Sequence, residues 1–242
     1  MKLTAHLYQH QPTANVVTAV LKYMDLKGFG LLDPILVCFL SSCEFVSMVV
    51  EGRFPDCPLS AVQTYVIHLL PRLLLRSGDT TQKSREEALT LLLGCAKSPI
   101  GPEKVGAMVL ADPIDADKKK IPPQNHRIHL SRLLVLQHIL EEHGTNRGHL
   151  TVDAIMNKLL IPSLNHSNNE LRELAINVIG CFDADAQQEA AKYMHLVSNA
   201  ATKAAVDEKL AVPPPPRDGG DGEEAPQAAK HKRTKSGGLA HS

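Results

Sequence analysis

The sequence holds twelve histidines, so metal binding is the first chemistry to test. Four of them fall in one stretch: His126 and His129 near its start, and His138 and His143 toward its end. A zinc ion needs three or four converging histidine, cysteine or carboxylate ligands, at a spacing that a helix or loop can deliver. No cysteine or carboxylate completes such a set around these histidines. The sequence therefore predicts no metal site and no bound cofactor.

Catalytic motifs are the second possibility. The sequence contains no nucleophile elbow, no glycine-rich phosphate loop and no H-E-x-x-H motif. Its five cysteines are scattered without a C-x-x-C pair, which predicts buried free thiols in a reducing compartment. We therefore expect a protein that is not an enzyme.

Charge is the remaining property that could support a function, and the totals of positive and negative side chains are equal. Lysine plus arginine equals aspartate plus glutamate, 26 of each, so the net charge predicts no nucleic acid partner. Any electrostatic function must come from how the charges are distributed over the surface. The elements that position the basic residues therefore decide what those residues can do.

An internal repeat indicates those elements. Residues 69–93 and 159–179 each hold an apolar run with a proline, a short polar loop and the pattern Arg-Glu-x-Ala, at Arg85 and Arg172. These arginines lie 87 residues apart, which is two periods of about 43. Such a period is typical of HEAT or armadillo helix pairs, which are stable only when stacked. We predict an all-α HEAT/armadillo-like solenoid of about four to five helix pairs plus a closing helix.

The chain divides into three parts. Residues 1–12 are polar and are expected to fray, residues 13–211 form the solenoid, and residues 212–242 are rich in proline, glycine and charge, which predicts a disordered tail. The most apolar run, residues 31–50, is interrupted by Asp33 and Glu44, so we interpret it as a buried helix and expect no membrane contact.

Several helix boundaries can be predicted. A helix is expected over residues 125–143, with Leu134 on its buried stripe, and Thr151 is expected to cap the next one. Capping boxes are expected at Ser84 with Glu87 and at Ser167 with Glu170. Residues 183–210 are alanine-rich and are predicted to form one long closing helix.

A family resemblance becomes specific from residue 69 onward. The stretch LLPRLLLRSGDTTQKSR, the helix start at His129-Leu130 and the segment His143-Gly144-Thr145 resemble the TOG domain of the ciliary-tip centrosomal protein of about 104 kDa. Thr151-Val152-Asp153 and Glu170-Leu171-Arg172-Glu173 are also similar. The resemblance covers roughly residues 33–182.

The resemblance implies a function. TOG domains are flat paddles of HEAT repeats that bind αβ-tubulin through the loops inside each repeat. It therefore implies a non-catalytic tubulin- or microtubule-binding domain, located in the cytoplasm and cytoskeleton at the centriole and the tip of the cilium or flagellum, with other ciliary or centriolar proteins as further partners. TOG domains normally open with a repeat that exposes a tryptophan. This chain has no tryptophan, and its first helix aligns with the second repeat.

The predicted binding residues are the basic side chains of the loops inside the repeats, together with one loop aromatic. They are Lys27, Phe29, Arg76, Lys83, Arg85, Lys118, Lys119, Lys120, Arg127 and Arg172. Alternatives remain open for several of them: Arg85 and Arg172 could pair with acids of neighbouring repeats, the three consecutive lysines could form only a solvated loop, and Phe29 could pack against the first two helices.

The tail carries a second basic cluster, at Lys230, Lys232, Arg233 and Lys235. This cluster could be an arm for the acidic microtubule surface, a nuclear-import-like patch or a solvated end. For the whole chain, the alternative function is a HEAT-repeat adaptor that binds another ciliary or trafficking protein without tubulin contact. An apolar patch on the helix face would favour that alternative.

Overall fold

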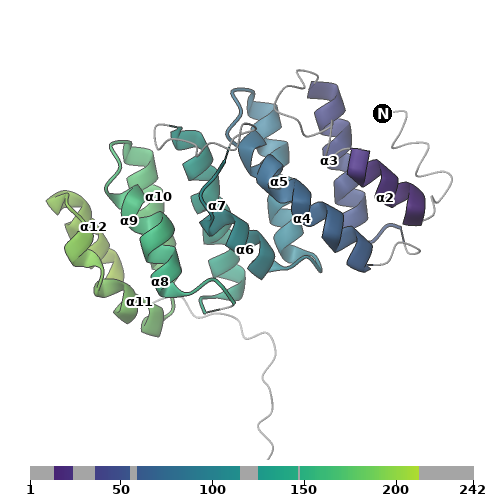
Figure 1. The fold of residues 1–242 in the computed structure, drawn as a ribbon. Helices are drawn as coiled ribbons and strands as arrows, with labels where there is room; N and C mark the ends of the chain where they lie inside the picture. The colour runs from purple at the N-terminus through teal and green to yellow at the C-terminus, as the bar shows by residue number, and fades with distance from the viewer. Residues whose placement is uncertain (1–13, 24–35, 55–58, 115–124, 147, 213–242) are drawn as a thin grey trace, which may run out of the picture.

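The computed structural model describes residues 14–23, 36–54, 59–114, 125–146 and 148–212. Every regular element in these residues is a helix, which confirms the predicted all-α solenoid (Figure 1). No helix within these ranges is both long and apolar enough to cross a membrane.

The helices form five consecutive pairs. The first pair is α2 (Ala14–Tyr23) with α3 (Leu36–Val50), the second is α4 (Leu59–Arg76) with α5 (Gln82–Lys97), and the third is α6 (Pro102–Leu110) with α7 (His126–His143). In the fourth pair the first helix has three segments, α8 (Val152–Ile155), η2 (Met156–Leu160) and α9 (Ile161–Leu164), and the second helix is α10 (Asn169–Gly180). The fifth pair is α11 (Ala184–Ala191) with α12 (Ala200–Leu210).

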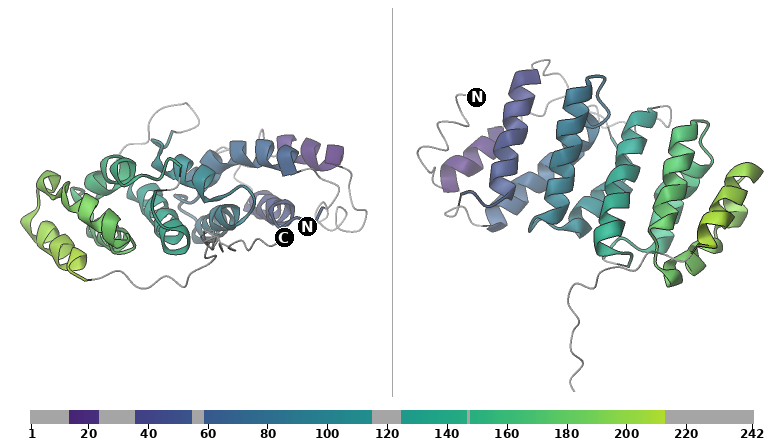
Figure 2. Two further views of the ribbon diagram at one scale, coloured as in Figure 1. Left: turned by 90° about the horizontal axis from the view of Figure 1, so that it is seen from below. Right: turned by 180° about the vertical axis from the view of Figure 1, so that it is seen from behind.

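The second helices of the pairs form one layer of the solenoid, which we call the B layer. In this layer α3 packs on α5, α5 on α7, α7 on α10 and α10 on α12. The right-hand view of Figure 2 shows these helices side by side. The first helices of the pairs form the opposite layer, in which α2 packs on α4 and α4 on α6. Within the pairs, α4 packs on α5, α6 on α7, α9 on α10 and α11 on α12.

The predicted period is confirmed by the helix starts. Helices α5, α7 and α10 begin at Gln82, His126 and Asn169, so successive starts lie 44 and 43 residues apart. Arg85 and Arg172 are both the fourth residue of their helices. The repeated pattern in the sequence is therefore one position in the fold.

The alanine of the repeated Arg-Glu-x-Ala pattern is buried in both copies. Ala88 and Ala175 are each 0% exposed. They belong to one buried core that is rich in leucines, among them Leu92 and Leu136. A small side chain at this position lets the second helix of the pair approach the rest of the stack closely.

A proline interrupts the first helix of the fourth pair. Pro162 has no N–H for the carbonyl four residues before it, and the wider turns of the π-helix η2 directly precede it. In the second pair, Pro71 lies inside the continuous helix α4. The two prolines at equivalent sequence positions are therefore accommodated in different ways.

The prediction of one long closing helix is wrong. Residues 184–210 form α11, the short 3-10 turn η3 (Met194–Leu196) and α12. The Asp183 carboxylate accepts from the N–H of Ala186, and the Asn199 side chain accepts from the N–H of Thr202. These two caps begin separate helices, so the closing element is a fifth pair.

Two predicted capping boxes are also displaced. Ser84 is buried within α5, which begins after Thr81, and α10 is capped by Asn168 in place of Ser167. The predicted cap at Thr151 is confirmed, because its hydroxyl accepts from the N–H of Ala154. The helix expected over residues 125–143 is confirmed as α7, although Leu134 is 40% exposed and not on its buried face.

We expect Ala88→Leu and Ala175→Leu each to lower the free energy of unfolding by about 1–3 kcal/mol, because added methylenes overpack a filled core. Urea unfolding followed by circular dichroism measures the effect. Ala204→Leu is the matched control, since Ala204 is exposed on α12 and its replacement should change stability by less than about 0.5 kcal/mol. Equal stability of all three variants would contradict the packing role of the repeated alanine.

Candidate binding edge

The described loops inside the pairs, residues 77–81, 165–168 and 192–199, lie along one edge of the solenoid, which we call the loop edge (Figure 1). The Ser131 hydroxyl of α7 donates to the carbonyl of Ser77 at 3.0 Å and brings the third pair against the loop of the second. The Asn165 side chain donates to the carbonyl of Leu196 at 2.9 Å and accepts from Ser198 at 2.8 Å. These contacts hold the loops of the fourth and fifth pairs together.

The loop of the second pair, residues 77–81, is organised around Asp79. Its carboxylate is 3.1 Å from the Arg76 guanidinium and accepts from the N–H of Thr81 at 3.2 Å. Partial burial raises the pKa of Asp79, but hydrogen bonds from Thr81, Arg76 and Thr80 outweigh burial, so the pKa lies below its ordinary value. Arg76 also lies over the ring of Phe39, 5.3 Å from its centroid.

An arginine of the following helix holds the loop of each of two pairs from behind. The guanidinium of Arg85 donates to the carbonyls of Asp79 and Thr80 at 3.0 and 2.8 Å. The guanidinium of Arg172 donates to the carbonyls of His166 and Ser167 at 2.7 and 2.8 Å. In both cases the acceptors lie six and five residues before the arginine.

In the third pair the equivalent contact comes from Arg132. It donates to the carbonyls of Val109 and Ala111 at 2.7 and 3.0 Å. Burial lowers the pKa of Arg132 to about 10, with the nearby charge of Asp112 acting in the opposite direction. Among the described residues, a buried or half-buried guanidinium thus fastens the loops of the second and fourth pairs and the start of the loop of the third.

These contacts separate the predicted basic residues into two groups. Arg76 is only 8% exposed, and Arg85 and Arg172 are half-buried with their donors directed at their own loops. Lys83 and Arg127 are exposed at the loop edge. The remaining predicted residues lie outside the described parts of the chain: Lys27, Phe29, Lys118, Lys119, Lys120, Lys230, Lys232, Arg233 and Lys235.

A shallow groove of about 450 Å³ runs beside the loop edge across α5, α7 and α10; we call it the edge groove. Arg85 and Arg127 line it together with apolar side chains, among them Leu134, Leu130 and Leu174. Its acidic members are Glu86, Glu170 and Glu173. The described part of the edge therefore carries mixed charge with an apolar strip.

The fifth loop, residues 192–199, carries exposed basic residues that the sequence analysis missed. Lys192 and His195 are exposed, and Asn165 holds this loop beside that of the fourth pair. The sequence signal that could have revealed this loop is the pair of cap residues Asp183 and Asn199, since each starts a helix. The sequence analysis did not use these caps and placed the loop inside one predicted helix.

The histidines at the end of α7 take part in ion pairing. The Glu142 carboxylate is 2.7 Å from the Lys97 ammonium, 3.3 Å from His138 and 3.8 Å from His143. The Lys97 hydrogen bond is the main cause that lowers the pKa of Glu142. Within the described ranges, no three histidine, cysteine or acidic side chains are grouped to hold a metal ion.

Stacked helix pairs with their internal loops gathered on one edge define a HEAT-repeat solenoid of the TOG type. The family model described as "Centrosomal protein CEP104, TOG domain" matches residues 14–178. The chain belongs to this CEP104 TOG-domain family.

Solved structures share the fold. A structure of the human Cep104 TOG domain matches with a TM-score of 0.60 and 18% identity, over 82% of this chain and 75% of that one. A CEP104 TOG domain matches with a TM-score of 0.62 and 16% identity, over 86% and 84%. The Zyg9 TOG domain from C. elegans matches with a TM-score of 0.56 and 21% identity, over 80% and 66%. Comparison with curated proteins gives no match.

We expect Arg85→Gln and Arg172→Gln to loosen the loop that each arginine holds. Losing the bonds to two carbonyls should lower local stability by about 1 kcal/mol and speed amide exchange roughly fivefold in residues 77–81 or 165–168, respectively. Hydrogen–deuterium exchange with mass spectrometry measures this change. Lys83→Gln, an exposed position on the same helix as Arg85, should leave the exchange of both loops unchanged.

Proposed function

We propose that this chain is a non-catalytic domain that binds tubulin or microtubules through its loop edge. The observation that carries the proposal is the alignment of the loops from successive pairs on one edge, within a chain of the CEP104 TOG-domain family. Because arginines fasten these loops to the helices behind them, the edge offers a rigid, pre-organised surface, which lowers the entropic cost of binding.

The exposed cations of the edge are proposed to face the acidic surface of tubulin. Lys83 and Arg127 are the described members of the predicted set that are exposed. The predicted Lys118, Lys119 and Lys120 extend this set, as do Lys192 and His195 of the fifth loop. Such charges act mainly on the association rate and on salt sensitivity, whereas affinity depends more on buried apolar contacts.

Arg76, Arg85 and Arg172 have a different proposed role. Their guanidinium groups already bind an acid or carbonyls of their own loops. They are proposed to shape the binding edge and not to contact tubulin themselves. By the same family relation, we propose that the chain acts at the centriole or the tip of the cilium or flagellum.

We expect the double variant Lys83→Glu with Arg127→Glu to weaken tubulin binding about tenfold at low salt, because two attractive charges become repulsive. Size-exclusion and co-sedimentation with purified αβ-tubulin measure the change. The difference should shrink at high ionic strength, as screening suppresses exposed charge interactions. The triple variant Lys118→Glu, Lys119→Glu, Lys120→Glu tests the third loop in the same assay.

The control is a second double variant, Lys104→Glu with Lys158→Glu. Both lysines are exposed and belong to the first-helix layer, and the reversal changes the net charge by the same amount. Its tubulin binding should equal that of the wild type. Equal loss in both double variants would mean that overall charge alone is responsible and would remove the loop edge from the mechanism.

The edge groove favours a second candidate function, a HEAT adaptor for another ciliary or trafficking protein. Its apolar strip includes Leu134, which is 40% exposed between charged rims. An adaptor of this kind would not co-sediment with tubulin at any salt concentration. If Leu134→Asp abolishes binding of a partner and Lys83→Glu leaves that binding intact, the adaptor function is favoured over the tubulin-binding function.

A further inference from the structure

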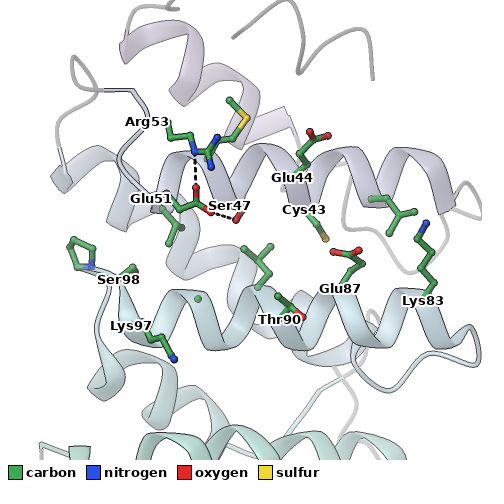
Figure 3. A pocket seen from close by; sticks show the side chains of 16 residues that line it. Cys43, Glu44, Ser47, Glu51, Arg53, Lys83, Glu87, Thr90, Lys97 and Ser98 are labelled. Carbon is green, nitrogen blue, oxygen red and sulfur yellow. Dashed lines mark hydrogen bonds and ion pairs between the residues drawn. The ribbon is translucent and has the colours of Figure 1, made fainter. Parts of the chain in front are cut away.

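A second groove lies in the B layer between α3 and α5, away from the edge groove (Figure 3). Its volume is about 1010 Å³. Its walls include Cys43, Glu44 and Ser47 of α3 and Glu87, Thr90 and Gly94 of α5. We call it the α3–α5 groove.

Gly94 lies on the α5 wall of this groove, with open space beside it. An added Cβ at Gly94 would meet nothing within 4 Å, whereas one at Gly78 or Gly106 would collide with a buried side chain, Ile128 or Leu150. Packing therefore requires the glycine at those two positions and not at Gly94. A glycine inside a helix costs about 0.5–1 kcal/mol relative to alanine, and no close packing contact requires it at Gly94.

The charges of the groove are only partly neutralised. Arg53 pairs with Glu51 at 2.7 Å, and Lys97 pairs with Glu142 at 2.7 Å. Glu44 lies on the α3 wall and Glu87 on the α5 wall, and neither forms a hydrogen bond or ion pair with another described residue. In Figure 3 the Glu87 side chain extends toward α3, whereas that of Glu44 points away from α5. Two unpaired carboxylates on the walls of the groove favour an occupant with positive charge.

The thiol of Cys43 is buried between the walls, and burial raises its pKa to about 12. The charge of Glu87 acts in the same direction, and that of Arg76 acts in the opposite direction. Lys83, at the end of the groove near the loop edge, is one exposed cation against these two carboxylates.

We propose that the α3–α5 groove is a docking site for the basic cluster of the chain's own C-terminal segment, at Lys230, Lys232, Arg233 and Lys235. The cluster supplies four positive charges within six residues. It would place lysine or arginine side chains along the walls that carry Glu44 and Glu87. This proposal is independent of tubulin binding, because it concerns a different surface and a different partner.

The chain is long enough to reach. Helix α12 ends beside α10, as an added Cβ at Gly180 would touch the Lys209 side chain, so the chain leaves the fold at the edge opposite the loop edge. The α3–α5 groove opens at that same edge, at Ser98 and Pro99. Neighbouring helices lie about 8–10 Å apart, so α12 is roughly 30–35 Å from the groove. The 18 residues from Val212 to Lys230 extend to about 60 Å.

The tether makes weak charge contacts sufficient. A segment joined to the domain meets its site at an effective concentration in the millimolar range. A few exposed ion pairs, each worth about 0.2–1 kcal/mol, can then hold it in place for part of the time. High salt should release it.

Zero-length carbodiimide cross-linking of the full chain tests the proposal, because it joins only carboxylates and amines that are in contact. We expect amide links from Glu44 or Glu87 to Lys230, Lys232 or Lys235, identified by mass spectrometry. An equal mixture of unlabelled and ¹⁵N-labelled protein distinguishes links within one chain from links between chains. Links within one chain are expected.

Two variants of one position provide the control. Gly94→Leu should fill the groove and reduce these links at least tenfold, whereas Gly94→Ala should keep them, since a methyl group leaves the groove open. The link between Lys97 and Glu142 should form equally in all three proteins and verifies that the fold is intact. Unchanged tail links in Gly94→Leu, links scattered over other carboxylates, or links only between isotopically different chains would each overturn the proposal.

Discussion

The structure depends on how the backbone carbonyls of the loops inside the pairs are satisfied. A loop carbonyl that no regular helix bond reaches needs another donor. In three pairs a guanidinium from the following helix provides it: Arg85 and Arg172 bind carbonyls of the loops, and Arg132 binds those of Val109 and Ala111 where the loop of the third pair begins. A planar guanidinium can bind two carbonyls at once, so one side chain fixes a loop against its own helix pair. In these three pairs the arginine therefore ties the loop to the helix behind it.

This use of arginine limits how much charge the loop edge can offer a partner. A guanidinium that already binds carbonyls contributes less to an approaching acidic surface than an exposed lysine does. Lys83 and Arg127 are exposed, while Glu86, Glu170 and Glu173 lie among the basic residues of the edge groove. The described edge is thus well ordered but not uniformly positive. Affinity for a large partner must then rely on shape and apolar contact as well as on charge.

The sequence predicted the fold well because a helix-pair repeat leaves a periodic record. The spacing of 87 residues between Arg85 and Arg172 became two steps of 44 and 43 along the stack. Caps were harder to predict, because neighbouring polar residues such as Ser167 and Asn168 are nearly equivalent in sequence, and only the folded loop selects one. The role of Arg85 and Arg172 could not be predicted, since their acceptors are backbone carbonyls, which every residue provides. The α3–α5 groove could not be predicted, since it forms only where α3 and α5 pack together.

The fifth pair lies almost entirely beyond the region that the family model matches, which ends at residue 178. Helix α12 covers α10, and Val178, Ile179 and Phe182 are 0% exposed beneath this end of the stack. The outer helix itself buries only Thr202 and Val206, and its exposed side chains are alanines and charged residues. A recombinant fragment trimmed to the matched region would lose this cover. The apolar side chains at its newly exposed end would then promote aggregation. The fifth pair thus serves as the solubilising cap of the solenoid.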